Sequence, residues 1–146
     1  MKLKTKEVLF VSDVNPEKGL VGGIPIYLKQ LISHFNKKNI KISLIGKGKN
    51  KNQFQVDRFI SVANKDENNK KLLFKLFLKV PFLKIKEGAV IHSQRPDFLL
   101  PFIIFKKSKT LVCTIHGNPG REITHKKGKI AGFIFNLLEY FVLKKT

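Results

Sequence analysis

The chain has 146 residues, of which 42% are hydrophobic, so it can supply the core of one domain. Its 29 Lys and Arg against 10 Asp and Glu give a formal net charge of +19, which predicts attraction to polyanions: nucleic acid, anionic lipid or phosphorylated substrates. A lone cysteine, Cys113, excludes an intramolecular disulfide framework and favours a cytoplasmic location. No apolar stretch approaches the roughly 20 residues of a membrane span, and the one near the amino terminus is too short for an export signal.

The first 45 residues predict a strand, a helix and a second strand. Residues 8–11 are a continuous apolar tetrad, typical of a parallel strand that is covered on both faces. Turn residues fill positions 12–23, and apolar residues then recur at helical spacing over residues 24–35. Residues 40–45 alternate between apolar and polar side chains, as in a strand. Because such crossovers are right-handed, the loop that ends at Gly23 should open at the carboxyl edge of the sheet, where ligands bind.

The rest of the chain continues this alternation, apart from a glycine-, lysine- and asparagine-rich segment at residues 46–52 that predicts a mobile loop. Further strands are predicted at residues 59–62, 89–92 and 111–115, and further helical segments at residues 70–84, 98–105 and 130–142. Pro81 should end or kink the first of these helices, and Asp97 is placed to cap the second. We therefore predict a single-domain α/β fold over residues 1–146: a Rossmann-like, doubly wound, mostly parallel sheet of about five strands in a three-layer α/β/α arrangement.

Gly22 and Gly23, directly before the first helix, form the first candidate site. Glycine lets the backbone approach a ligand closely, and the free amides of a first helical turn attract an anion such as phosphate. A simple turn explains the pair equally well. The pattern matches neither GxGxxG nor the P-loop, which removes the usual support for those two kinds of nucleotide site.

His116 follows a buried-type strand and opens a glycine-rich loop with Gly117 and Asn118. At a strand end its imidazole would reach the ligand edge, where a near-neutral pKa suits contact with a substrate hydroxyl or phosphate. His92 ends the preceding predicted strand and, with Arg95, forms a second polar group at the same edge. Both histidines are expected to face one cleft, although a histidine in such a place is also compatible with a structural role alone.

The remaining histidines and the cysteine do not predict a metal site. His34 falls on the first predicted helix and His125 in a predicted loop, and no pair of histidines shows metal-ligand spacing. Cys113 lies inside a predicted strand, which favours a packed thiol over a nucleophile paired with His116.

In their order and spacing these segments resemble the amino-terminal domain of family 4 glycosyltransferases. The likeness covers nearly the whole chain. It is carried by the strand at 8–11, by Gly22-Gly23-Ile24 at the start of the first helix, by the strand at 40–45, by Val90-Ile91-His92 and by Thr114-Ile115-His116-Gly117.

The resemblance implies a GT-B fold, in which two Rossmann-like domains face each other and the first holds mainly the acceptor. It implies that Gly22 and Gly23 approach the diphosphate of a nucleotide-sugar, such as a UDP- or GDP-sugar, and that His116 is a catalytic residue beside the donor sugar. His92 is carried over from the family as a further substrate contact. Arg95, Gly117 and Asn118 are expected to contact substrate because they lie at the same predicted edge. No metal is expected, and the sugar should keep its anomeric configuration.

This chain matches only the acceptor-side domain, so the donor-binding carboxy-terminal domain is missing. Transfer to a glycan or lipid-linked acceptor, as in cell-envelope polysaccharide synthesis, is therefore expected only when a second domain or a partner subunit completes the cleft. A truncated gene and a split enzyme fit the sequence equally.

The lysine-rich surface has two further interpretations. Lys71, Lys75 and Lys79 follow one face of the predicted helix at 70–84, which is typical of peripheral helices on the inner face of an anionic membrane but also of a merely solvated face. The alternative function is a basic nucleic-acid-binding α/β module without enzymatic activity, which the lysines within residues 47–51 favour, although no RNP-like strand, zinc knuckle or helix-turn-helix accompanies them. A response-regulator-like domain would need acidic neighbours for Asp13, and the sequence offers none.

Overall fold

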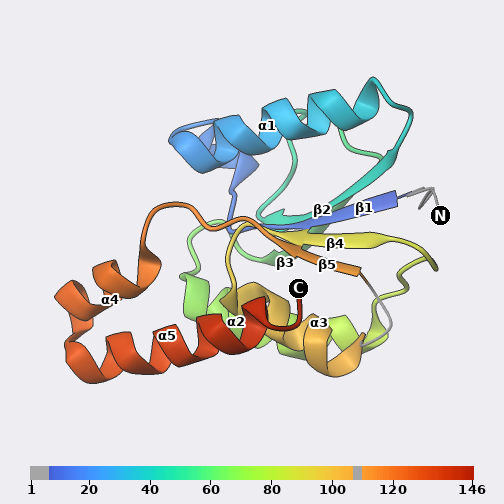
Figure 1. Cartoon of the computed structure of the whole chain (residues 1–146). Coiled ribbons are helices and arrows are strands. Elements are labelled where there is room, and N and C mark those ends of the chain that lie inside the picture. Colours follow the sequence, from blue (N-terminus) through green and yellow to red (C-terminus); the bar gives the residue numbers. More distant parts are fainter. Residues whose placement is uncertain (1–6, 107–109) are drawn as a thin grey trace.

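The computed structural model describes residues 7–106 and 110–146, and within them five strands form one fully parallel sheet (Figure 1). The strands are β1 (Glu7–Val11), β2 (Lys41–Lys47), β3 (Arg58–Ala63), β4 (Val90–Ser93) and β5 (Thr110–Cys113), in the spatial order β3-β2-β1-β4-β5. The central strand β1 pairs with β2 on one side and β4 on the other, so that Val11 lies between Ile45 and Ser93. The winding direction reverses between β1 and β4, and in open α/β sheets such a switch point opens the crevice that takes ligands.

Helices cover both faces of the sheet, which confirms the predicted three-layer α/β/α fold. Helix α1 (Gly23–Asn36) lies on one face, and α2 (Asn69–Lys79), α3 (Leu100–Phe105) and α5 (Lys129–Leu143) lie on the other (Figure 1). Helix α4 (Pro119–Lys127) packs against α5 beyond the carboxyl ends of the strands. Three short 3-10 helices, η1 (Pro16–Lys18), η2 (Val80–Phe82) and η3 (Asp97–Leu99), complete the structure.

The apolar residues of β1 explain why both faces need helices. Val8 and Phe10 belong to the core cluster under α1, with Leu28 and Ile32, while Leu9 and its neighbour Val11 belong to the cluster under the other helices. Each such side chain stabilises the fold by roughly 1.5–3 kcal/mol when fully buried. The continuous apolar tetrad is thus the pattern of a strand between two hydrophobic layers.

Two expectations about local structure were wrong. Residues 119–127 form helix α4 rather than a loop, so His125 is helical: the Asn118 side chain accepts a hydrogen bond from the Arg121 backbone N–H (3.0 Å) and caps the helix. Asp97 does not cap the segment that follows it, because both of its carboxylate oxygens accept hydrogen bonds from Arg95.

The predicted helix at 70–84 ends as an α-helix at Lys79, and Pro81 lies in η2, as a proline in that position requires. In the described ranges, 7–106 and 110–146, none of the helices combines the length and apolar character needed to cross a membrane.

Candidate functional site

The two histidines of the predicted edge lie together where β4 and β5 end. The imidazole Nε2 of His116 lies 2.7 Å from Oε1 of Gln94, and Nε2 of His92 lies 2.7 Å from Oγ1 of Thr114. Because an amide oxygen only accepts, His116 donates from Nε2 to Gln94. We call His92, Gln94, Thr114 and His116 the histidine cluster. Its hydrogen bonds join the carboxyl end of β4 to that of β5.

Burial controls the chemistry of the histidine cluster. Desolvation lowers the pKa of His92, and the nearby charge of His116 lowers it further, so His92 is held neutral near pH 7. Gln94 is only 1% exposed, and its Nε2 has no hydrogen-bond partner among the described residues. A buried donor of this kind costs about 1–3 kcal/mol, and unsatisfied groups are rare enough in native proteins to mark places where function competes with stability.

Helix α1 reaches the histidine cluster through Tyr27. The Tyr27 ring stands edge-on to the His116 imidazole, with 5.2 Å between ring centroids. Tyr27 lies about one turn after Gly23, so this contact places His116 beside the first turns of α1. Phe10 of β1 packs against His92, also at 5.2 Å, and supports the cluster from the sheet.

The loop that contains Gly22 and Gly23, hereafter the diglycine loop, lines a cavity of about 380 Å³ at the start of α1. Gly22 has φ 98° and ψ 167°, a backbone conformation that is essentially reserved for glycine. Gly23 does not have a positive φ, and a Cβ at either glycine would meet no atom within 4 Å. No side chain caps α1 and its first turn holds no acidic residue, so the first-turn amides have no side-chain partner from the helix itself. Lys18 and Asp13 also line this cavity.

A second polar group, which the sequence did not predict, lies where β1 and β2 end. Lys47 donates from Nζ to Oδ1 of Asn69 (2.7 Å), and Asn69 donates from Nδ2 to Oδ2 of Asp13 (2.7 Å). Lys47 is 8% exposed, and burial lowers its pKa, although the charge of Asp13 opposes that effect. The composition of residues 46–52 predicts a mobile loop, yet Lys47 is the last residue of β2. The rule that functional groups gather at strand ends would have singled it out.

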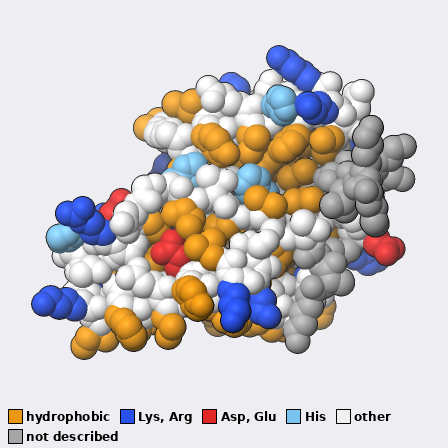
Figure 2. Space-filling view, viewed as in Figure 1, with side chains coloured by type: hydrophobic (Ala, Val, Ile, Leu, Met, Phe, Trp, Pro, Cys, Tyr) orange, Lys and Arg blue, Asp and Glu red, His pale blue; other side chains and the backbone are white. Residues whose placement is uncertain are grey.

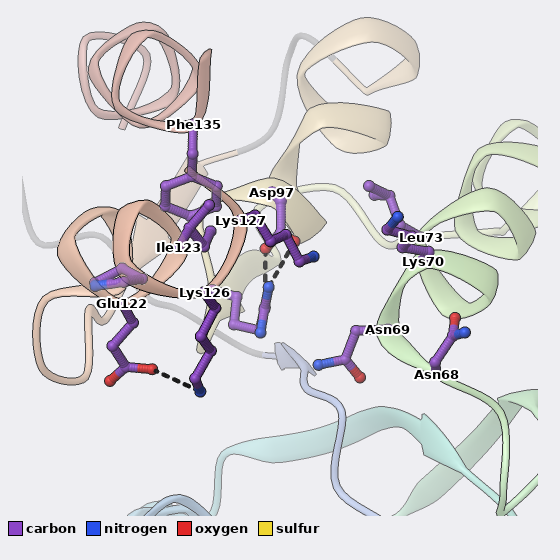
Figure 3. Close-up of a pocket in the computed structure, with 12 residues that line it drawn as sticks. Asn68, Asn69, Lys70, Leu73, Asp97, Glu122, Ile123, Lys126, Lys127 and Phe135 are labelled. Atoms are coloured by element: carbon purple, nitrogen blue, oxygen red, sulfur yellow. Dashed lines mark hydrogen bonds and ion pairs between the residues drawn. The ribbon is translucent and has the colours of Figure 1, made fainter. Parts of the chain in front are cut away.

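Arg95 and the loop after His116 have structural partners of their own. Arg95 donates to both carboxylate oxygens of Asp97 (3.0 and 2.9 Å) and lies over the Phe98 ring, 5.1 Å from its centroid. Burial alone lowers the pKa of Arg95, but its hydrogen bonds with Asp97 and that residue's charge outweigh burial and raise it. Arg95 lines a cavity of about 510 Å³ between α2 and α4 (Figure 3), not the cavity of the diglycine loop. Gly117 has φ 73°, and Asn118 caps α4.

Cys113 is partly buried, and burial raises the pKa of its thiol to about 11, so it stays protonated and packs against the core below α5. Among the residues that the structure describes, no three His, Cys, Asp or Glu side chains gather as metal ligands do.

The edge of the sheet therefore brings together the diglycine loop, the histidine cluster and the Asp13–Asn69–Lys47 group. No protein-family model, no curated protein and no solved structure matches the chain.

Proposed function

We propose that the chain is the acceptor-side half of a glycosyltransferase resembling family 4. It transfers a sugar from a nucleotide-sugar to a glycan or lipid-linked acceptor once a donor-binding domain or subunit completes the cleft. The observation that carries this proposal is the contact between Tyr27 and His116, because it brings the start of α1 and an imidazole together at the carboxyl edge of the sheet.

The conformation of the diglycine loop supports this proposal. Gly22 is required by its backbone angles, but nothing in the fold requires a glycine at Gly23: its φ is ordinary and a Cβ there would lie in open space. A ligand that approaches the backbone supplies the missing reason. The uncapped first turn of α1, with Lys18 in the same cavity, favours a negatively charged one, such as the diphosphate of a nucleotide-sugar.

His116 supplies the reactive side chain in this proposal. Gln94 holds its Nε2, and no hydrogen bond to its Nδ1 is present among the described residues, so that nitrogen is available to a hydroxyl of the donor sugar. His92 is held neutral by burial and is bonded to Thr114, which leaves His116 as the histidine of the cluster that contacts the donor sugar.

Membrane contact belongs in this proposal to α5 rather than α2. Lys75 pairs with Glu67 (2.6 Å) and Lys79 donates to the Ser61 carbonyl (3.0 Å), so two of the three lysines that share one face of α2, Lys71, Lys75 and Lys79, have partners within the chain. Helix α5 instead exposes a row of large apolar side chains: Ile130, Phe133, Ile134, Leu137, Tyr140 and Phe141. Figure 2 shows apolar side chains along this lower edge of the molecule.

Charge decides what covers this row. Lysines lie at both ends of α5: Lys127 precedes it, Lys129 is its first residue, and Lys144 and Lys145 follow it. An apolar strip between basic ends matches the headgroup region of an anionic membrane, where the apolar residues enter the lipid and the lysines meet phosphates. We therefore assign an anionic phospholipid surface as its partner, which would keep the protein on the inner face of the membrane.

A reconstituted transfer assay tests the proposed function. The chain is mixed with a candidate donor-binding domain, and transfer from labelled UDP- and GDP-sugars is measured, with calorimetry of nucleotide-sugar binding to the chain alone and to the mixture. We expect weak binding to the chain alone, tighter binding to the mixture, and transfer that requires both. Two results would contradict the proposal: tight binding of nucleotide-sugar to the chain alone, or sugar transfer by the donor-binding domain in the absence of the chain.

The net charge of +19 supports nucleic-acid binding as a second candidate function. A salt titration separates the two functions. A steep fall of affinity with salt, together with a preference for one sequence or for single strands, would favour the nucleic-acid module over the transferase.

A further inference from the structure

We propose that the cavity of about 510 Å³ between α2 and α4 binds a phosphate monoester that carries an apolar group. It is hereafter called the basic cavity. Its lining comes from three helices and from the residues after β4, and α2 and α4 each contribute both apolar and cationic side chains (Figure 3). Its volume is in the range of small-molecule sites.

Two lysines of the basic cavity have no ion-pair or hydrogen-bond partner among the residues that the structure describes. Lys70 comes from α2 and Lys127 from the end of α4, on different walls, and neither makes an ion pair or hydrogen bond within the described part of the chain. Lys126 approaches Glu122 only loosely, at 3.8 Å, with both side chains largely in solvent. Lysines that converge from separate helices without carboxylate partners create a local demand for an anion.

Arg95 gives the basic cavity a fixed donor. Its two hydrogen bonds to Asp97 and its position over the Phe98 ring hold the guanidinium in one orientation. Of the five N–H donors of an arginine, these bonds use two, and three are left for a ligand. Such a rigid fork matches phosphate geometry better than a mobile ammonium group does.

The formal charge of the lining agrees with a phosphate monoester. Lys70, Arg95, Lys126 and Lys127 contribute four positive charges against two negative charges from Asp97 and Glu122, which leaves +2. A phosphate monoester carries about −1.5 to −2 at pH 7. The cavity can therefore neutralise one such group.

The apolar wall identifies the rest of the ligand. Leu73, Ile123 and Phe135 line the same cavity, from α2, α4 and α5. Phe135 is already buried, whereas Leu73 and Ile123 are partly exposed. Inorganic phosphate would leave the exposed part of this wall in water, whereas an alkyl chain would cover it and gain about 0.8 kcal/mol for each buried methylene. The ligand is thus an amphiphile: a phosphate on an apolar body.

The basic cavity is close to the histidine cluster, because Arg95 directly follows Gln94, the partner of His116. Its ligand is in our view the acceptor, and this part of the inference rests on the proposed function. The binding itself does not, since it needs only the residues of this chain.

Calorimetry or NMR titration of the intact chain tests the inference with four probes: hexyl phosphate, hexanol, a hexose 1-phosphate and inorganic phosphate. We expect hexyl phosphate to bind tightest and the double variant Lys70→Gln/Lys127→Gln to weaken it by at least about tenfold, since two charged hydrogen bonds are lost. The matched control Lys29→Gln/Lys38→Gln changes two exposed lysines of α1 and its carboxyl end and should bind as the unaltered chain does.

Equal loss in both double variants would reduce the effect to net charge and overturn the site. Inorganic phosphate or hexose phosphate binding as tightly as hexyl phosphate would overturn the apolar half of the inference. If hexyl phosphate fails to bind while reconstituted transfer persists, only this inference falls. If hexyl phosphate binds and no partner restores transfer, the site stands and the proposed function falls.

Discussion

The ring of Tyr27 meets the imidazole of His116 edge-on, 5.2 Å from centroid to centroid, and so joins α1 to the end of β5. Tyr27 comes after β1 in the chain and His116 comes after β5. These two strands are not neighbours in the sheet, since β4 lies between them. The contact exists because parallel strands end at one edge and the helix after the central strand starts there. A diphosphate at the start of α1 and a sugar beside His116 would consequently be adjacent.

The first prediction is that His116→Ala lowers the turnover of the reconstituted enzyme by about 100-fold or more, the usual cost of one lost transition-state contact. The free energy of unfolding should fall by only about 1–3 kcal/mol, because His116 is half-buried and gives one hydrogen bond, to Gln94. Steady-state kinetics and urea denaturation measure the two effects. His34→Ala, at an exposed histidine of α1, is the control and should change neither. Unchanged turnover in His116→Ala removes the catalytic role.

The second prediction separates the two glycines. Gly22→Ala should destabilise the chain by roughly 1–3 kcal/mol, because alanine is strained at φ 98° and ψ 167°. Gly23→Ala should leave stability within about 1 kcal/mol of the original, since its Cβ meets nothing, yet weaken nucleotide-sugar binding in the reconstituted enzyme by about tenfold or more. Denaturation curves and calorimetry on both variants check this. Normal donor binding by Gly23→Ala would show that no ligand approaches that backbone.

The fold could be predicted from the sequence because its signals are local. A continuous apolar run such as residues 8–11 requires cover on both faces, and the spacing of apolar residues in α1 and α5 is plainly helical. The right-handed crossover then fixes which edge collects the loops. Helix α4 is not predicted, although Asn118, Pro119 and Gly128 are ordinary start and stop signals, because the glycines around them also fit a loop.

The candidate site could be predicted only in outline. Strand ends placed His92 and His116 at one edge, but their partners Gln94 and Thr114 depend on the β4–β5 register, which puts Ser93 opposite Cys113. The same limit applies to the lysines of α2: periodicity gives the face they share, whereas their partners come from other elements. Pairings across elements are decided by packing, and a single sequence does not contain them.

The third prediction concerns acid sensitivity. Burial, and then His116, lower the pKa of His92 in the folded chain, whereas the unfolded chain has the ordinary value of about 6.5. Below that pH the unfolded state takes up a proton that the folded state resists. The contribution of His92 to the free energy of unfolding should therefore be fully present above about pH 6.5. It should fall as the pH drops towards the pKa that His92 has in the folded chain, by at most about 1.4 kcal/mol per pH unit.

Urea denaturation at about pH 7.5, 6.5 and 5.5 measures this slope. His92→Gln should flatten it, whatever its effect on stability at neutral pH, because glutamine does not titrate. His125→Gln, at an exposed histidine of α4, should keep the slope of the unaltered chain. An equal slope in His92→Gln would mean that another group causes the acid sensitivity.

The fourth prediction is that the chain binds vesicles of phosphatidylglycerol and phosphatidylcholine in equal parts through α5, and binds pure phosphatidylcholine far less. Phe133→Gln/Leu137→Gln should weaken binding roughly 100-fold, since each side chain contributes about 1.5 kcal/mol or more when it enters the lipid. The matched control is Phe74→Gln/Leu78→Gln on α2, whose side chains are similarly exposed. Vesicle sedimentation measures binding, and salt should weaken it as headgroup contacts are screened.

The α2 control also decides between the two helices. If the α2 double variant loses vesicle binding and the α5 double variant keeps it, the membrane surface is the lysine-bearing helix α2, despite the partners of Lys75 and Lys79 within the chain. If neither double variant changes vesicle binding, but the α5 double variant converts a dimer of the chain to a monomer in sedimentation equilibrium, α5 is covered by a second copy of the chain instead. Membrane binding through α5 therefore requires one pattern: loss in the α5 pair, retention in the α2 pair, and a monomer without lipid.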